Sequence, residues 1–294
     1  MPATVAVVTD STATLEPTLA AAHGITVVPL QIVVGGTAYQ EGVEASPDVI
    51  ASALSQFVPV STSRPAPEAF MQLYERLLGA GHESCVSVHL SGEVSGTAES
   101  ARLAATETRL SVTVVDTRLV GIGTGLAALA AARAAQGGAD GPRVAAAARA
   151  QAGATTSFVY VDTLEHLRRG GRVGNAAALM GAALAVKPLL GLEGGRLVQK
   201  EKVRTAARAL ARIEELVVGA AGGLGEVPRI VVVQHLAAPE RARNLAERLR
   251  TRLTGGAGVV TVEVGEVGAV IGAHVGPGMV AVVVAPMWTV DTMD

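Results

Sequence analysis

The stretch that decides the fold is residues 84–135, SCVSVHLSGEVSGTAESARLAATETRLSVTVVDTRLVGIGTGLAALAAARAA. Residues 84–90 and 111–116 are apolar runs with the length and the β-branched content of strands. Each is followed by a stretch of helical length, residues 96–106 and 121–135, the second of them rich in alanine. Strands that alternate with such helices are joined by crossover connections, which place the strands parallel in one sheet. The sequence therefore predicts an α/β fold.

The same alternation extends toward the N-terminus and then gives way to a glycine-rich loop. Further strands are predicted at residues 5–9 and 25–34, and further helices at residues 46–57 and 65–79. Residues 136–142 form the loop, and an alanine-rich helix follows as far as Ala152. We therefore predict an N-terminal parallel-sheet domain over residues 1–153.

The second half of the chain contains a hairpin among its strands and helices. Strands are predicted at residues 156–161, 229–234, 259–264 and 280–285, and helices at residues 174–184, 205–219 and 239–253. Residues 186–192 and 196–203 are predicted to pair as the hairpin, which turns at Glu193-Gly194-Gly195. A hairpin among crossover units implies a mixed sheet, so residues 154–294 are predicted to form a C-terminal mixed α/β domain.

Composition and charge exclude several classes of function. The net charge is −2 and only 2% of residues are aromatic, so neither electrostatics nor stacking favours a nucleic acid partner. The single cysteine, Cys85, excludes a disulfide within the chain and a cysteine-based zinc site. The histidines do not fall at metal-ligand spacing, so no metal is expected. The apolar residues are almost all aliphatic, so a cavity in this core would be lined by methyl groups.

Two features bear on membranes and location. The N-terminus has no basic segment followed by a long apolar one, so a cytoplasmic protein is expected. Residues 267–290 carry no Asp, Glu, Lys or Arg and are long enough to span a bilayer. Gly276, Pro277 and Gly278 interrupt them. We predict a short helix, a turn and a buried strand there, with no stable membrane insertion and at most transient membrane contact.

A glycine-rich turn at residues 121–125 raises the possibility of a nucleotide site. It follows a strand and opens a helix, as a dinucleotide-binding turn does. The third glycine, Gly125, comes one residue too early, and the nearest acidic residue at the required distance, Asp140, lies in a loop. No phosphate-binding loop with lysine and no nucleophile elbow is present. A tight turn explains the glycines, and a nucleotide-dependent enzyme remains the alternative function.

Hydroxyl side chains gather at two predicted junctions between a strand and a helix. Ser61-Thr62-Ser63 precedes one helix and Ser91-Gly92-Glu93-Val94-Ser95-Gly96-Thr97 the next. Free N–H groups at helix N-termini bind anions, although ordinary N-capping explains either cluster alone. Two clusters at the same end of a parallel sheet predict one shared anion site. A regulatory protein for small anions would use the same site.

Basic residues and one histidine complete the candidates. Arg168, Arg169 and Arg172 surround two glycines, and Arg204 follows Lys200 and Lys202. Such loops suit phosphate groups, although charge runs are also common on solvated faces. His274 lies among glycines that permit close approach of a ligand, and its imidazole can hydrogen-bond a carboxylate.

Together these segments resemble the DegV family, the fatty-acid-binding proteins that serve as the FakB subunit of bacterial fatty acid kinase. The matching motifs run in family order across nearly the whole chain. They are VTDST (8–12), TSRP (62–65), SGT (95–97) with SA (100–101), DTLEHLRRGGR (162–172), KP (187–188), KVRT (202–205) and GAHVGPG (272–278).

The resemblance implies a long-chain fatty acid buried between two α/β domains, with its tail in an aliphatic tunnel. The carboxylate ligands that it implies are Thr62, Ser63, Ser95, the backbone near Gly96, and His274. A separate ATP-dependent kinase would phosphorylate the carboxyl group, with Arg169, Arg172 and Arg204 facing that kinase or the acyl phosphate. The resemblance implies a carrier subunit without catalytic residues of its own and with no cofactor besides the bound acid.

Two residues depart from the family pattern. Arg64 stands where glutamine is common beside the Thr-Ser pair, so a change in head-group screening is expected. Gly92-Glu93 stands where a second serine is common before Ser-Gly-Thr. A Glu93 carboxylate that points inward would weaken anion binding.

Overall fold

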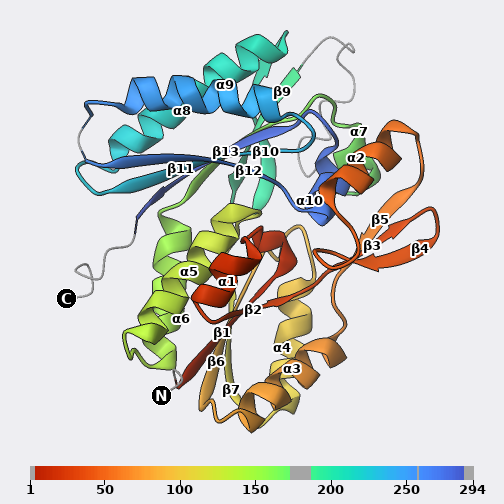
Figure 1. Ribbon diagram of the computed structural model, residues 1–294, viewed down its shortest axis with the longest axis vertical. Helices are drawn as coiled ribbons and strands as arrows, with labels where there is room; N and C mark the ends of the chain where they lie inside the picture. The colour runs from red at the N-terminus through yellow and green to blue at the C-terminus, as the bar shows by residue number, and fades with distance from the viewer. Residues whose placement is uncertain (1–3, 173–186, 257, 288–294) are drawn as a thin grey trace.

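The computed structural model describes residues 4–172, 187–256 and 258–287, and its N-terminal part is built on a parallel sheet (Figure 1). The strands are β1 (Val5–Asp10), β2 (Ile25–Val28), β6 (Ser84–His89) and β7 (Ser111–Asp116), in the order β2-β1-β6-β7. All three pairings are parallel. The predicted α/β fold with a parallel sheet is confirmed.

Helices cover both faces of the parallel sheet, which explains why its strands are rich in valine. Val5 and Val7 of β1 pack on α5 (Ile122–Gln136) and α6 (Gly141–Gly153). Ala6 and Val8 point the other way, toward α3 (Pro67–Gly79) and α4 (Thr97–Glu107). Because α5 and α6 are largely alanine, the sheet and the two helices pack closely.

The C-terminal part is a mixed sheet, as predicted. Its order is β10-β9-β8-β13-β11-β12, and only β11 and β12 are parallel. The strands are β8 (Thr156–Tyr160), β9 (Lys187–Glu193), β10 (Arg196–Val203), β11 (Arg229–His235), β12 (Val260–Glu266) and β13 (Val280–Pro286). Helices α8 (Ala206–Gly223) and α9 (Pro239–Leu253) cover the face that points away from the parallel sheet (Figure 1). The helix predicted at residues 174–184 lies outside the described residues.

One predicted strand is wrong, and the error moves a site residue. Residues 25–34 break at Pro29, which has no N–H to donate to a sheet, into β2 and a separate strand β3 (Gln31–Val34). β3 pairs with β4 (Thr37–Gln40) and β5 (Val60–Ser63) in a three-stranded antiparallel sheet, called here the small sheet. Thr62 therefore lies in the small sheet. The prediction that both hydroxyl clusters sit at one end of the parallel sheet is wrong.

The uncharged stretch 267–290 forms a short helix, a turn and a buried strand, as far as it is described. Helix α10 (Ala269–Val275) ends at Gly276, whose φ of 76° suits glycine, and β13 follows. No helix in the described part of the chain has both the length and the apolarity to cross a membrane.

Helix α10 joins the small sheet to the C-terminal domain. Its Ala269, Val270 and Ala273 pack against Leu30 just before β3, Ile32 of β3 and Ile50 of α2 (Pro47–Ser55). Its other side contacts α7 (Glu165–Arg169) of the C-terminal half. All strands of the parallel sheet precede residue 153 and all strands of the mixed sheet follow it. Helix α10 also follows residue 153, yet it packs on residues of the N-terminal half. The boundary at residues 153 and 154 remains a prediction.

Candidate functional site

A cavity of about 190 Å³ lies where the two domains and the small sheet meet. Its polar lining consists of Thr12, Thr62, Ser63, Arg64, Ser95, Gly96, Arg172 and His274. The rest of its lining is aliphatic: Leu30, Leu90, Val94, Val120, Leu167, Leu197, Val270, Ile271 and Val275. All five residues expected around the carboxylate therefore line one cavity, although three separate parts of the chain supply them. No aromatic residue lines it in the described structure, in keeping with the aliphatic wall that the composition suggested.

A hydrogen bond between the small sheet and α10 marks the polar end of the cavity. Thr62 Oγ1 lies 2.8 Å from His274 Nε2, across 212 positions of sequence. Removal of the imidazole from water, helped by the positive charge of Arg172, lowers the pKa of His274 to about 4. His274 is therefore neutral at neutral pH and adds no positive charge to the cavity.

The remaining nitrogen of His274 has no hydrogen-bond partner among the described residues. His274 Nδ1 lies against Gly170, where a Cβ atom would collide with it. Gly170 follows α7 directly. The residue that permits this close approach is therefore one of the two glycines between Arg169 and Arg172. The glycine fixes where the ring of His274 can sit, and it leaves one ring nitrogen unused.

The second hydroxyl cluster supplies a further part of the cavity wall. Ser95 Oγ lies 2.9 Å from Thr97 Oγ1, and Gly96 caps α4 without a side chain to receive the helix N–H groups. The free N–H groups at the start of α4 and the Ser95 hydroxyl are groups that can bind an anion. Thr62 and Ser95 thus approach one cavity from different elements.

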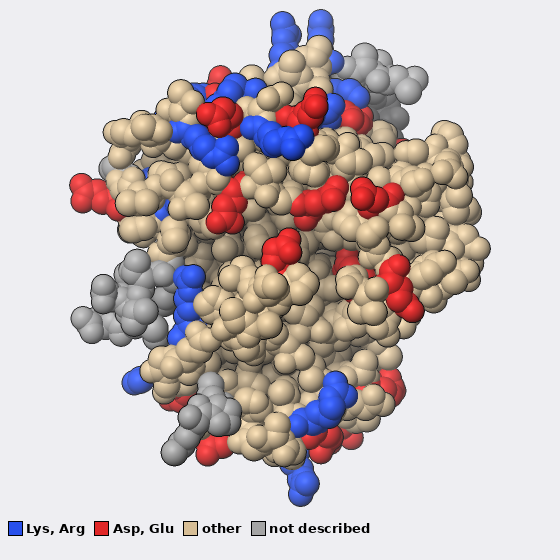
Figure 2. Space-filling view, viewed as in Figure 1, with Lys and Arg blue, Asp and Glu red and all other residues tan. Residues whose placement is uncertain are grey.

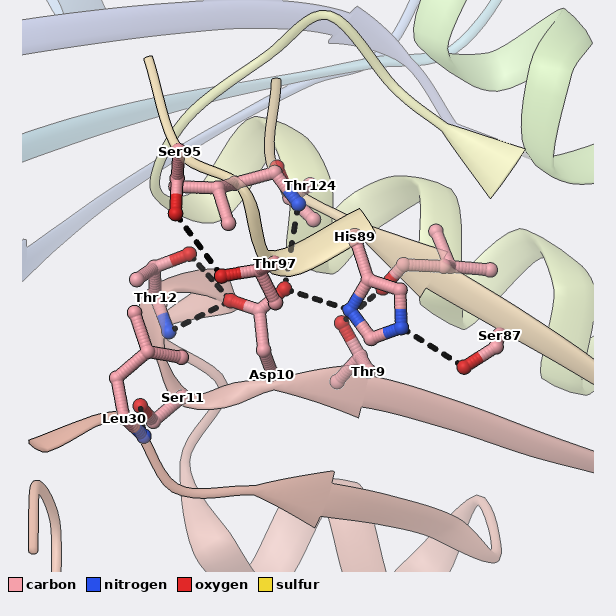
Figure 3. Close-up of polar contacts among 12 residues, drawn as sticks. Thr9, Asp10, Ser11, Thr12, Leu30, Ser87, His89, Ser95, Thr97 and Thr124 are labelled. Carbon is pink, nitrogen blue, oxygen red and sulfur yellow. Dashed lines mark hydrogen bonds and ion pairs between the residues drawn. The ribbon is translucent and has the colours of Figure 1, made fainter. Parts of the chain in front are cut away.

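A buried network below the cavity was not predicted from sequence. The Asp10 carboxylate, at the end of β1, accepts hydrogen bonds from the Thr12 and Leu90 N–H groups and the Thr12 hydroxyl, and its Oδ2 lies 2.8 Å from His89 Nδ1 (Figure 3). Thr12 and Leu90 both line the cavity, so Asp10 holds two parts of its wall. Within the sequence, the only signals were Asp10 in the VTDST motif and a histidine in an apolar strand.

The hydrogen bonds of this network can all be donated in the same direction, from Tyr74 toward Asp10. Tyr74 donates its hydroxyl proton to Ser87 Oγ at 2.9 Å, and Ser87 lies 2.8 Å from His89 Nε2. With Ser87 donating to Nε2, the proton on Nδ1 is left for Asp10. Every polar atom of the chain Tyr74–Ser87–His89–Asp10 is thereby paired in the protein interior.

Charge separates this cavity from a larger neighbouring groove of about 750 Å³. Five acidic residues line the groove: Asp10, Glu16, Glu41, Glu44 and Glu266. Acidic side chains also spread across the middle of the face in Figure 2, where the domains meet. The smaller cavity is lined by two arginines and by no Asp or Glu within the described residues. A carboxylate ligand is therefore favoured in the smaller cavity and repelled by the groove.

Of the three arginines expected to face a partner, one belongs to the cavity. Arg172 lines it and donates from Nε to the Val94 carbonyl at 3.0 Å and from Nη1 to the Gly170 carbonyl at 2.5 Å. Arg169 is exposed on α7 and pairs with Glu165, and Arg204 is exposed just after β10. The structure thus places Arg172 in the wall and the other two on the surface; their roles remain predictions.

Comparison with known proteins identifies the family. A model of the DegV family, described as uncharacterised, matches residues 4–287. A DegV domain-containing protein of Streptomyces coelicolor is 51% identical over 281 residues, covering 96% of this chain and 98% of the relative. The chain belongs to the DegV family.

Solved DegV structures share the whole fold. A DegV family protein from Thermus thermophilus, described as fatty acid binding, superposes with a TM-score of 0.89 at 32% identity and covers 96% of this chain and 99% of that one. DegV from Bacillus subtilis, described as a fatty acid binding protein, gives a TM-score of 0.86 at 30% identity over 96% and 99% of the two chains.

The position of Glu93 answers one question that its departure from the DegV pattern raised. Its carboxylate pairs with the Arg196 guanidinium of β10, with Oε2 2.7 Å from Nε. Glu93 does not line the cavity. The carboxylate therefore points to the β9–β10 hairpin, where the neighbouring Ser91 hydroxyl also donates to the Gly195 carbonyl.

The glycine-rich turn at residues 121–125 is used for packing between domains. Gln234 of β11 places its Oε1 3.1 Å from the Ile122 N–H, and its Nε2 donates to Thr14 Oγ1 at 2.9 Å. A Cβ on Gly121 would lie 2.7 Å from that Oε1, and one on Gly125 would lie 2.5 Å from the Ala13 carbonyl. Both glycines are therefore explained by close contacts, and a side chain already occupies the N–H group that a phosphate would use.

Proposed function

We propose that this protein binds a long-chain fatty acid, with the carboxylate at Thr62, Ser95 and the Gly96 backbone and with the tail along the aliphatic wall. The observation that carries the proposal is the Thr62–His274 hydrogen bond at the polar end of an otherwise aliphatic cavity. The description of the Thermus and Bacillus relatives as fatty acid binding supports it.

The hydrogen bond also assigns a role to His274. With Nε2 protonated, His274 donates to Thr62 Oγ1, and the Thr62 hydroxyl proton is then free for the carboxylate. Neutral donors satisfy the head group without the desolvation cost of a second buried charge. His274 thus positions Thr62, which contacts the ligand.

The tail supplies most of the binding free energy. About 15 methylenes at about 0.8 kcal/mol each contribute roughly 12 kcal/mol before the costs of ordering and association. The cavity of about 190 Å³ is below the roughly 300 Å³ at which ligand pockets usually begin. We expect the small aliphatic side chains behind the polar end to move apart when a whole acyl chain enters.

The finer part of the proposal concerns the fate of the carboxylate. We propose that a separate ATP-dependent kinase phosphorylates it while the acid is bound, so that this chain carries and presents the substrate. Exposed Arg169 and Arg204 would contact that partner. A pull-down of kinase activity with wild-type protein, but not with an Arg169→Glu/Arg204→Glu variant that still binds palmitate, is the expected result.

The main test is direct. Denaturing extraction and mass spectrometry of protein purified from cells should release a long-chain fatty acid, and delipidated protein should take up added palmitate or oleate. The double variant Thr62→Ala/Ser95→Ala should bind palmitate about tenfold to a hundredfold more weakly while staying folded, because two hydroxyl donors to a charged group are lost. Unchanged palmitate affinity in that variant would refute the site.

Two other ligands separate the alternatives. A small-anion regulatory protein would bind acetate or butyrate as well as palmitate. A nucleotide-dependent enzyme would show a higher melting temperature with added nucleotide. We expect neither result. A small anion would leave the aliphatic wall without a contact, and Gln234 already bonds the N–H group of the glycine-rich turn that a nucleotide phosphate would need.

A further inference from the structure

Arg64 occupies an unusual position at the polar end of the cavity. It follows β5 directly and lies two residues from Thr62, and its side chain lines the same cavity as Ser95 and His274. The Nη1 atom and the side-chain carbons of Arg64 lie so close to Gly96 that a Cβ on Gly96 would collide with them. Glycine at position 96 therefore creates the room that the Arg64 guanidinium fills.

The guanidinium of Arg64 is not engaged by protein groups. It makes no hydrogen bond or ion pair with any residue in the described parts of the chain, and no Asp or Glu of those parts lines the cavity. Arg172, which also lines the cavity, differs, since it donates to the carbonyls of Val94 and Gly170. Arg64 is thus an exposed cation with free donors, in the lining of the same cavity as Thr62 and Ser95.

Neither His274 nor Glu93 competes with Arg64 as the charged partner of an anion. His274 is neutral at neutral pH and is committed to Thr62. Glu93, the nearest carboxylate in the Ser91–Thr97 segment, is held by Arg196. Of the two arginines in the lining, Arg64 is therefore the one whose guanidinium is not already bonded to a protein group among the described residues.

We propose that Arg64 is a ligand of the bound head group and the residue that makes this site select an anion over a neutral group. It would form a charge-assisted hydrogen bond, bidentate where the head group allows, to the carboxylate that Thr62 and Ser95 hold. This inference rests on the proposed function, because it requires a fatty acid in the cavity.

The same geometry would also suit the opposite role, in which Arg64 blocks the site, and the experiment must distinguish the two roles. The guanidinium lies against Gly96, where the head group would bind, so it could act as a plug that a ligand displaces. A ligand role predicts weaker acid binding when Arg64 is removed. A plug predicts tighter binding of acid and alcohol alike.

The test compares palmitate with hexadecanol, which has the same tail and an uncharged head. Both are titrated into delipidated wild-type protein and into Arg64→Gln, Arg64→Lys and Arg109→Gln. Arg109 is a matched control, because it is exposed, lies between α4 and β7 and does not line the cavity. Melting temperatures establish that each variant is folded.

For Arg64→Gln we expect about a tenfold loss of palmitate affinity, the lower range for a charged hydrogen bond, and little change for hexadecanol. Arg64→Lys should fall between wild type and Arg64→Gln, since it keeps the charge without the planar fork. Palmitate binding to wild type should weaken with added salt more steeply than binding to Arg64→Gln. Arg109→Gln should match wild type in all respects.

The outcomes distinguish the proposed function from the role of Arg64. Failure of wild-type protein to bind palmitate would overturn the proposed function itself. If wild type binds palmitate but Arg64→Gln keeps the same preference over hexadecanol, only the role of Arg64 is refuted. Tighter binding of both ligands to Arg64→Gln would establish a plug and would likewise refute it.

Discussion

Two histidines of this protein make the same contact and end in opposite situations. His89 Nε2 lies 2.8 Å from the Ser87 hydroxyl, and His274 Nε2 lies 2.8 Å from the Thr62 hydroxyl. The second nitrogen of His89 meets the Asp10 carboxylate, whereas the second nitrogen of His274 faces Gly170 without a partner. The first network is closed and fully buried; the second lies in the wall of a cavity.

The difference separates a structural network from a binding site. Buried polar groups that are all paired hold the backbone around them, here Thr12 and Leu90. Polar groups that keep unused donors beside a cavity, such as Arg64 and the Thr62 hydroxyl, have capacity for a ligand. Similar residue types thus stabilise the fold where all their hydrogen-bonding atoms are paired, and can bind a ligand where some of those atoms are left unpaired.

The largest expected effect is on the closed network. Asp10→Ala removes a buried acceptor and leaves the donors of Thr12, His89 and Leu90 unpaired. The free energy of unfolding should fall by about 3–5 kcal/mol, because several buried donors lose a charged acceptor at about 1–3 kcal/mol each. Urea denaturation measures it. Exposed Asp48 supplies the control, and a loss no larger than that of Asp48→Ala would contradict the role given to Asp10.

The open site should respond to pH. The pKa of His274 is lowered from 6.5 to about 4 in the folded protein, so the unfolded chain binds the proton first as the pH falls. Its contribution to stability should be complete above pH 6.5 and should decline by roughly 1–3 kcal/mol toward pH 4. Denaturation curves of wild type and His274→Gln at a series of pH values measure this effect. The contributions of the other histidines cancel in the difference between the two proteins. Parallel curves for the two proteins would show that His274 does not titrate this way.

The smallest of the three effects concerns the glycine that holds His274 in place. Gly170→Ala keeps a permitted backbone but brings a methyl group against Nδ1, so the imidazole must shift from Thr62. Palmitate affinity should fall about tenfold, in line with a modest overpacking cost. Gly153→Ala, at a position with open space around it, is the control. Equal affinity of both variants would mean that the ring position does not matter for binding.

Prediction from sequence succeeded where the pattern is local. The parallel strands are recognisable because burial on both faces makes them rich in β-branched apolar residues, as in the VAVV segment of β1. The turn at Gly194 and Gly195 identified the β9–β10 hairpin, and Gly276 and Gly278 identified the turn before β13. Prediction failed at residues 25–34, where the apolar run is continuous but Pro29 separates strands of two different sheets.

The sequence by itself determined the α/β class, the mixed second sheet, the aliphatic character of the interior and the residue types gathered around one site. Only the tertiary structure decided which of them meet: Thr62 with His274 across 212 positions, and Glu93 with Arg196 across 103. It also set Arg64 over Gly96 and closed the Asp10–His89 network. The reason is physical. Periodicity and turn chemistry act between neighbours in the chain, whereas the partner of a polar group depends on how whole elements pack.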